Sequence, residues 1–314
     1  MIANYNYGRF LPDALDSLLS QSCQDFEIII IDGGSTDNSV EVIKKYAGDL
    51  PPATERPQTL KPSHPHTLNP STPSNPSNPS NSSNSSNISY WVSEPDKGQS
   101  DAFNKGFAKA RGRFLTWLNA DDVLLPGTIE KLKSAVGMHP ECEWFVGGCY
   151  WLDKELRILK CFRARSFSEV RFRTGQVSSW GPSSFFTKRL LDKVGGVDVR
   201  CKYTMDGDLW LKFAAIAGAR YLPFANYCWG LRLHECAKMS AHNFSESGQS
   251  DPSHPKWKQI AYEGAIRKEY FTPTAHRTCW NWFRSIRWGT VLMSRIDTVR
   301  LRGTLAFKTA ATAK

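Results

Sequence analysis

The sequence has 314 residues, 40% hydrophobic side chains and a formal net charge of +10, enough for one large domain or one domain with appendages. No apolar run approaches the roughly 20 residues of a membrane-spanning helix, and the first residues show no signal-peptide pattern. The eight cysteines are scattered without a CxxC pair, which favours reduced thiols in a cytoplasmic protein over a disulfide framework or a zinc site.

Strand and helix patterns alternate through the first part of the chain. The expected order is helix 10–22, strand 26–32, helix 35–47, strand 88–94, helix 98–110 and strand 113–119. Ser35 or Thr36 is the expected cap of the second helix. Only Met1 and Ile2 precede Ala3, so a first strand that is short or that starts upstream is expected here. The alternation predicts an α/β layered fold with a mixed, mainly parallel central sheet.

Residues 51–87 interrupt this pattern. Proline, serine and asparagine dominate the segment, and apolar side chains are almost absent. Such a composition cannot bury enough surface to offset its ordering entropy, which predicts disorder. Because the patterns on both sides belong together, we interpret the segment as a loop inserted within one domain.

The second half of the chain has mixed patterns. Residues 143–162 predict two strands around a turn, 178–198 a strand, a helix and a Gly-Gly turn, and 204–224 a helix with an acidic start followed by a strand. Residues 256–314 carry 12 Lys/Arg and 3 Asp/Glu, hence about +9, and favour basic helices. We predict one α/β domain at 1–240, with the 51–87 segment inserted in it, and a basic, aromatic-rich helical extension at 241–314.

Carboxylates follow two of the predicted strands. Asp32 ends one strand, and the adjacent pair Asp121-Asp122 ends another. In parallel sheets, ligands bind beyond the carboxyl ends of the strands. Two adjacent carboxylates at a strand end repel each other, and Mg²⁺ or Mn²⁺ would relieve that repulsion. Asp206 and Asp208 begin a helix, where aspartate is also a common cap.

Taken in order, six motifs resemble the inverting glycosyltransferases of family 2, which have the GT-A fold, in particular those of bacterial cell-surface glycan synthesis. They are YN at 5–6, DGGSTD at 32–37, EPDKG at 94–98, NKG at 104–106, NADD at 119–122 and MDGDLW at 205–210. The resemblance extends over about residues 2–240.

The resemblance implies a nucleotide-sugar site. It implies that Asp32 accepts a hydrogen bond from the base and that Tyr5 flanks that base. Lys97 and Asn104 are implied near the nucleotide. Asn119 and Asp122 are implied near the ribose or in support of the metal ligand, and these six make up the expected donor site.

The same resemblance implies the metal site and the catalytic base. Asp121 is the implied metal-binding carboxylate, and His234 of a late Arg-x-His motif reaches the metal or the diphosphate. Asn119 departs from the family pattern, because it stands where a further aspartate is usual. Asp206 is implied as the general base that deprotonates the acceptor hydroxyl, which gives inversion. Asp208 is expected to cap its helix, and Trp210 to lie in the core.

The expected function is metal-assisted transfer of a sugar from a nucleotide-sugar to a hydroxyl of a glycan or lipid-linked acceptor, in cell-surface polysaccharide synthesis. Two alternatives stay open. One is a nucleotidyltransferase on a similar fold, although the sequence shows no Gly-rich phosphate loop after the first strand. The other is a non-catalytic, decayed relative with a truncated first strand. No nucleic-acid partner is expected.

Residues 276–305 interleave tryptophans and aliphatic residues with arginines. This pattern suits a helix lying at a membrane surface, which would place the protein in the cytoplasm and peripherally at the inner face of the membrane. It equally suits a helix that packs on the catalytic domain with its charged side outward.

Overall fold

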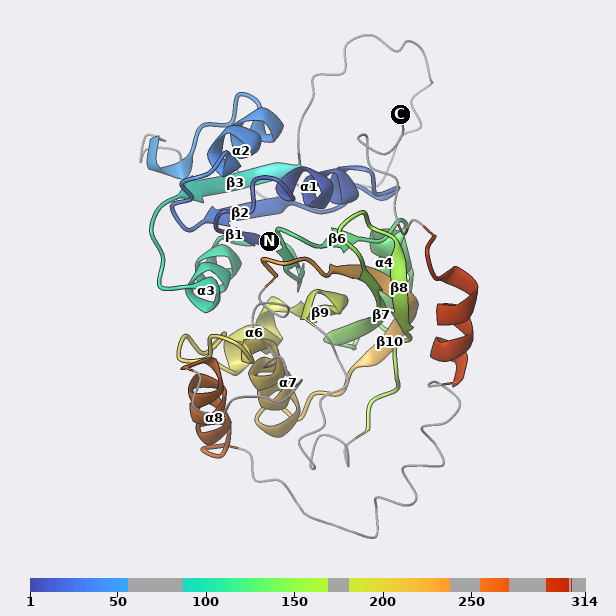
Figure 1. Ribbon diagram of the computed structural model, residues 1–314. Helices are drawn as coiled ribbons and strands as arrows, with labels where there is room; N and C mark the ends of the chain where they lie inside the picture. The colour runs from blue at the N-terminus through green and yellow to red at the C-terminus, as the bar shows by residue number, and fades with distance from the viewer. Residues whose placement is uncertain (56–86, 169–180, 238–254, 271–291, 305, 307–314) are drawn as a thin grey trace, which may run out of the picture.

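The computed structural model describes residues 1–55, 87–168, 181–237, 255–270, 292–304 and 306 (Figure 1). Residues 56–86, which make up most of the predicted insert, lie outside the described residues. Two β-sheets with helices packed around them form the described part, and this layered α/β arrangement confirms the predicted fold class.

Sheet A is parallel and has the strand order β3-β2-β1-β5. Its strands are β1 (Ile2–Asn4), β2 (Ile28–Asp32), β3 (Ile88–Ser93) and β5 (Leu118–Asn119). Every residue of the isoleucine-rich β2 is buried, as expected of a central parallel strand. The first strand has three residues, lies in the middle of the sheet and pairs with both β2 and β5.

Three helices pack around sheet A in the order that the sequence predicts (Figure 1). They are α1 (Leu11–Leu19), α2 (Ser39–Ala47) and α3 (Gln99–Lys109). The predicted cap of α2 is wrong, because Asn38 occupies the N-cap position and makes no side-chain cap bond. Ser35 instead donates its hydroxyl to Asp32 Oδ1, which holds it in the preceding loop.

The predicted single strand at 113–119 is split between the two sheets. Phe114 and Leu115 form β4, which pairs with β9 in sheet B, whereas Leu118 and Asn119 form β5 in sheet A. A continuous apolar run predicts that the residues are buried, but it does not predict which sheet each residue joins. The change from sheet B to sheet A within this segment was therefore not predicted.

Sheet B has the order β4-β9-β7-β10-β6, and β8 pairs with β7. The strands are β4 (Phe114–Leu115), β6 (Val123–Leu124), β7 (Trp144–Leu152), β8 (Ile158–Phe162), β9 (Ser184–Thr187) and β10 (Leu222–Arg232). The other helices are α4 (Thr128–Met138), α6 (Lys188–Lys193), α7 (Met205–Ala215), α8 (Pro255–Arg267) and a helix over 292–301, with 3₁₀ turns η1 (Ala53–Glu55) and η2 (Gly181–Ser183).

An aromatic core lies between α7 and the strands of sheet B. The fully buried Trp210 stacks between Trp117 and Trp144, with ring centroids 5.4 and 5.5 Å away. Offset-stacked rings add to the stabilisation that comes from buried area alone. Trp210 is therefore a core residue, as predicted.

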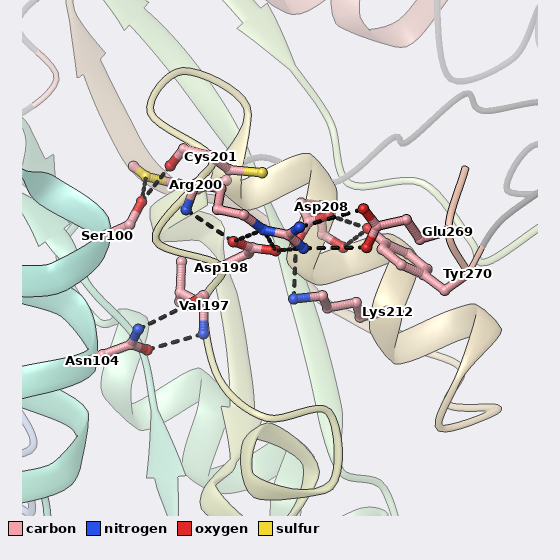
Figure 2. A network of polar contacts seen from close by, with 11 residues as sticks. Ser100, Asn104, Val197, Asp198, Arg200, Cys201, Asp208, Lys212, Glu269 and Tyr270 are labelled. Atoms are coloured by element: carbon pink, nitrogen blue, oxygen red, sulfur yellow. Dashed lines mark hydrogen bonds and ion pairs between the residues drawn. The ribbon is translucent and has the colours of Figure 1, made fainter. Parts of the chain in front are cut away.

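Helix α8 lies within the predicted C-terminal extension and packs beside α7 (Figure 1). At its end, Glu269 forms an ion pair with Arg200, and Tyr270 donates a hydrogen bond to Asp208 (Figure 2). Asp208 also pairs with Lys212 at 3.2 Å. The predicted cap role of Asp208 is wrong, because the N-cap of α7 is Thr204 and Asp208 is engaged with Lys212 and Tyr270.

None of the helices in the described part of the chain combines the length and the apolar character needed to span a bilayer.

Candidate active site

One cavity of about 1080 Å³ opens where the ends of β1, β5 and β10 meet α7 and α8. Its wall includes side chains from segments far apart in the sequence, namely Tyr5, Asn119, Asp121, Asp206, Arg232 and Trp257. Gly181 and Pro182 also line it. The cavity thus lies beyond the carboxyl ends of the strands of sheet A, where ligands of parallel sheets bind.

Asp121, which lies in this wall, pairs with His234, which is buried and is not among the residues that line the cavity. Asp121 Oδ2 lies 3.1 Å from His234 Nε2, and the imidazole side chain is fully buried. Phe10 packs on the imidazole with ring centroids 4.2 Å apart, and Tyr7 meets it edge-on. The aromatic contacts fix the ring so that Nε2 points at the carboxylate.

The donor atoms of this pair suit a divalent cation. The two atoms lie at a hydrogen-bond distance of 3.1 Å, and two ligands at right angles on an octahedral ion, each about 2.1 Å from it, would also be about 3 Å apart. No group of three or more His, Cys, Asp or Glu able to hold a metal occurs among the described residues. A cation held here would therefore take its other ligands from water and substrate phosphates, as Mg²⁺ commonly does.

Asp122 faces away from the cavity and is fully buried. Its carboxylate accepts hydrogen bonds from the Arg232 backbone N–H and from Asn119 Nδ2. Burial, and then the charge of Asp121, raises the pKa of Asp122 well above its ordinary value. The structure thus does not place Asp122 where it could touch a ribose. Asp122 instead stabilises the turn that carries Asp121, because one of its carboxylate oxygens is bonded to Arg232 of β10 and the other to Asn119.

Asp206 lines the cavity from the first turn of α7. Its Oδ1 accepts a hydrogen bond from the Gly207 backbone N–H at 2.7 Å. Met205 and Thr204 beside it also line the cavity. The fold thus brings Asp121 and Asp206, more than 80 positions apart in the sequence, to one cavity.

Asp32 is fully buried and is absent from the cavity wall. Its carboxylate accepts four hydrogen bonds, from the Asn4 amide, the Ser93 hydroxyl, and both the hydroxyl and the backbone N–H of Ser35. These bonds occupy the lone pairs that a nucleotide base would need. Asp32 thus fixes the loop whose Gly33 and Gly34 line the cavity, and Tyr5 lies there with its side chain 58% exposed.

The three other residues predicted for the donor site lie at different distances from the cavity wall. Asn119 lines the cavity, and its Oδ1 accepts a hydrogen bond from Gln99 Nε2 at 3.0 Å. Lys97 is exposed, next to the wall residues Asp96 and Gly98. Asn104 lies outside the wall, because both ends of its amide bond the backbone of Val197 (Figure 2).

The replacement Asn104→Ala is expected to cost stability rather than donor affinity. It removes the bond from Nδ2 to the Val197 carbonyl (2.7 Å) and leaves the Val197 N–H without its acceptor. We expect a loss of about 1–2 kcal/mol in the free energy of unfolding, measured by urea denaturation, with an unchanged KM for the nucleotide-sugar. A large rise in KM at unchanged stability would instead support the nucleotide contact that the sequence implies.

Sequence reasoning missed the contribution of α8. Lys256, Trp257 and Ile260 line the cavity, and the buried Glu263 faces the loop before α7. Its carboxylate accepts hydrogen bonds from the backbone N–H groups of Lys202, Tyr203 and Thr204 and from the Thr204 hydroxyl. This carboxylate from another helix takes the place of a side-chain cap at the start of α7.

One feature of the sequence could have indicated the role of Glu263. Glu263 is a lone acidic residue in a basic helix, three positions from Ile260 and from Ile266, so it shares their apolar face. Burial by itself would raise the pKa of Glu263, but the bonds from Thr204, Gln259 and the backbone outweigh it and hold the pKa below its ordinary value. A charged residue on the apolar face of a helix therefore suggests that it binds a buried polar group of another element.

Known proteins match both the sequence and the fold. Residues 1–58 and 80–146 match the family model described as glycosyl transferase family 2. An uncharacterized glycosyltransferase of Nostoc sp. is 33% identical over 216 residues, which cover 66% of this chain and 56% of that protein. A PGL/p-HBAD biosynthesis glycosyltransferase of Mycobacterium bovis is 28% identical over 148 residues, or 47% of this chain and 44% of that protein.

The fold also resembles solved structures. TarS of S. aureus (residues 1–349), in complex with UDP-GlcNAc, superposes with a TM-score of 0.54 at 15% identity, covering 85% of this chain and 64% of that one. This likeness shows the fold alone. The chain spans about half the length of the curated relatives it matches. The family model and the curated relatives support a glycosyltransferase of family 2 over the part of the chain that they match, and the observed fold agrees with this.

Proposed function

We propose that this protein transfers a sugar from a nucleoside diphosphate sugar to an acceptor hydroxyl, with inversion and with the help of a divalent cation. One observation carries the proposal: Asp121, which pairs with the buried His234, and Asp206 from α7 line the same cavity. A glycosyltransferase of this kind needs a group to hold the diphosphate and a base for the acceptor, and the cavity offers both. The match to the family model favours this activity over the nucleotidyltransferase alternative.

Asp206 is the proposed general base. Displacement at the anomeric carbon requires that the acceptor hydroxyl lose its proton as the oxocarbenium-like transition state develops. The bond from the Gly207 N–H to Oδ1 holds the carboxylate at the start of α7, where Asp206 lines the cavity. A base that acts on the face opposite the leaving group gives a product of inverted configuration.

Asp121 and His234 are the proposed holders of the cation. A cation bound there would stabilise the charge on the leaving diphosphate as a Lewis acid. Asp122 keeps Asp121 in place through Asn119 and β10, and Asn119 presents its amide to the same wall. Mg²⁺ and Mn²⁺ both suit this oxygen and nitrogen donor set.

The neighbours and relatives support a class of donor and a class of acceptor. TarS binds UDP-GlcNAc, which supports a nucleoside diphosphate sugar as the donor class here. The curated relatives include a PGL/p-HBAD biosynthesis glycosyltransferase and a chondroitin synthase, which supports a glycan or lipid-linked acceptor in cell-surface polysaccharide synthesis.

The substitution Asp121→Asn is expected to abolish the cation dependence. Loss of the carboxylate should lower kcat/KM by at least about 100-fold. It should also remove the rise in melting temperature that Mn²⁺ plus a nucleoside diphosphate gives the wild type, since only a ligand that binds the native state stabilises it. Asp49→Asn, at an exposed position on another loop, serves as the matched control.

The decisive experiment compares release of nucleoside diphosphate from a panel of nucleotide-sugars by the wild type, Asp121→Asn and Asp206→Asn, in the presence of Mn²⁺. Turnover by the wild type that both variants lose supports the proposal. Equal turnover in all three proteins would reject the assigned site, and no turnover by a wild type that binds the donors would favour the non-catalytic alternative.

A further inference from the structure

The helix over 292–301 packs on the outer edge of sheet B with a polar face inward. Asp297 forms an ion pair with Arg163 at 2.6 Å and accepts a hydrogen bond from the Tyr227 hydroxyl. The Ser294 hydroxyl accepts a hydrogen bond from the Arg163 backbone N–H just after β8 at 3.1 Å, and the Thr298 hydroxyl accepts one from the Cys161 backbone N–H of β8 at 3.0 Å. After the helix, residues 303–306 add backbone bonds to residues 156–158. These contacts fix the orientation of the helix.

The opposite face of this helix is apolar and exposed. Leu292, Ile296 and Val299 are 56%, 47% and 84% exposed, respectively. At about 100° per residue these three positions lie within about 60° of one another, so they form one stripe. The amphipathic pattern is inverted with respect to an ordinary surface helix, which buries its apolar stripe against the protein.

Arginines flank the stripe on both sides. On the helical wheel Arg295 and Arg302 lie on one side of the stripe and Arg300 on the other. All three are exposed, and among the described residues none has an ion-pair partner. An apolar stripe bordered by arginines suits a lipid surface. The aliphatic side chains can enter the region where the acyl chains begin, while the guanidinium groups contact the lipid headgroups.

We propose that the exposed face of the helix over 292–301 is a docking surface for anionic lipid membranes. The surface consists of Leu292, Ile296 and Val299 with the three flanking arginines. A second copy of the chain fits this face poorly. The helix is only about 15 Å long, whereas a stable protein interface buries about 800 Å² on each partner. Two copies would also bring their arginines together. Lipid phosphates complement that charge.

Vesicle flotation of the full chain tests the proposal. We expect the protein to float with vesicles of phosphatidylcholine and phosphatidylglycerol, to bind vesicles of phosphatidylcholine alone much more weakly, and to dissociate as salt is raised. Replacing Leu292, Ile296 and Val299 together by Ser should lower the affinity for the anionic vesicles at least about tenfold. Replacing Arg295, Arg300 and Arg302 by Gln should lower it at least about 30-fold.

The double variant Val199→Ser/Ile216→Ser is the matched control, because it removes two apolar side chains that are 49% and 47% exposed elsewhere. Since all the replaced side chains are exposed, melting temperatures should stay close to that of the wild type. Binding that is equal in the stripe variant and the control overturns the proposal. So does a wild-type dimer that the stripe substitutions dissociate, or a wild type that stays with the unbound fraction.

Discussion

Asp206→Asn is expected to lower kcat for sugar transfer about 1,000-fold, within the range that a positioned general base contributes. The amide keeps the size of the side chain, and its oxygen still accepts the hydrogen bond from the Gly207 N–H. It has no basic oxygen to take the proton of the acceptor hydroxyl. The loss should therefore fall on the chemical step.

A measurement of donor binding distinguishes the loss of a general base in Asp206→Asn from a folding defect. In Asp206→Asn the thermal shift caused by the nucleotide-sugar and Mn²⁺ should equal that of the wild type, because Asp121 and His234 are unchanged. The exposed Asp49→Asn is the matched control and should keep full activity. A variant with wild-type kcat would show that another group removes the proton. A variant without the thermal shift would place Asp206 in donor binding instead.

Glu263→Gln is expected to lower both stability and activity, although Glu263 lies in the C-terminal extension. The carboxylate accepts hydrogen bonds from three successive backbone N–H groups before α7. A glutamine would turn an N–H₂ group toward donors and leave at least one buried N–H unpaired. Bonds to a buried charge are worth about 1.5–3 kcal/mol each, so we expect a loss of about 3 kcal/mol in the free energy of unfolding. We also expect a reduced kcat, because the loop leads directly into Asp206.

The same contacts give a pH dependence with a definite sign. The folded-state pKa of Glu263 is lowered, so its contribution to stability is fully present above the unfolded-state pKa of about 4.3. It is lost as the pH falls through the folded-state value. Urea denaturation should therefore show the gap between wild type and Glu263→Gln at pH 7 and a narrowing gap below about pH 4.3.

Glu269→Gln is the matched control for Glu263. It lies just after α8, but its side chain is 58% exposed, and its ion pair with Arg200 is long at 3.3 Å. An exposed pair of this kind is worth about 0–1 kcal/mol. Equal effects of the two substitutions would contradict the role of Glu263 at the start of α7. A constant stability gap from neutral to acid pH would contradict its ionised state in the folded protein.

The sequence by itself determined the local elements and the class of fold. The isoleucine-rich run at 28–32 predicted a buried parallel strand, and the structure confirms it, because in such a strand burial on both faces dictates residue type. The ordered motifs pointed to family 2 before any geometry was known. They also picked out Asp121 and Asp206, two chemically conspicuous carboxylates, and both line the cavity.

Only the tertiary structure decided which polar residues reach the cavity. The motifs implied nucleotide contacts for Asp32 and Asn104, and a ribose contact or a supporting role for Asp122. In the structure the polar atoms of these residues are engaged with Ser35, with the Val197 backbone and with Arg232. Those partners come from other elements, and their distances depend on long-range packing that a residue pattern does not encode. The pairing of Asp121 with His234 likewise joins β5 to the segment after β10, 113 positions apart.

The C-terminal helices show most clearly what the sequence determines and what the tertiary structure decides. The sequence predicted basic helices there but could not choose between a membrane surface and packing on the domain. In the structure α8 packs on the domain and supports the start of α7 through Glu263, whereas the helix over 292–301 turns its polar face inward and its apolar stripe outward. The charge and the periodicity of a helix follow from its sequence. Which face is buried depends on the groups it meets, and here Arg163 and Tyr227 draw Asp297 inward.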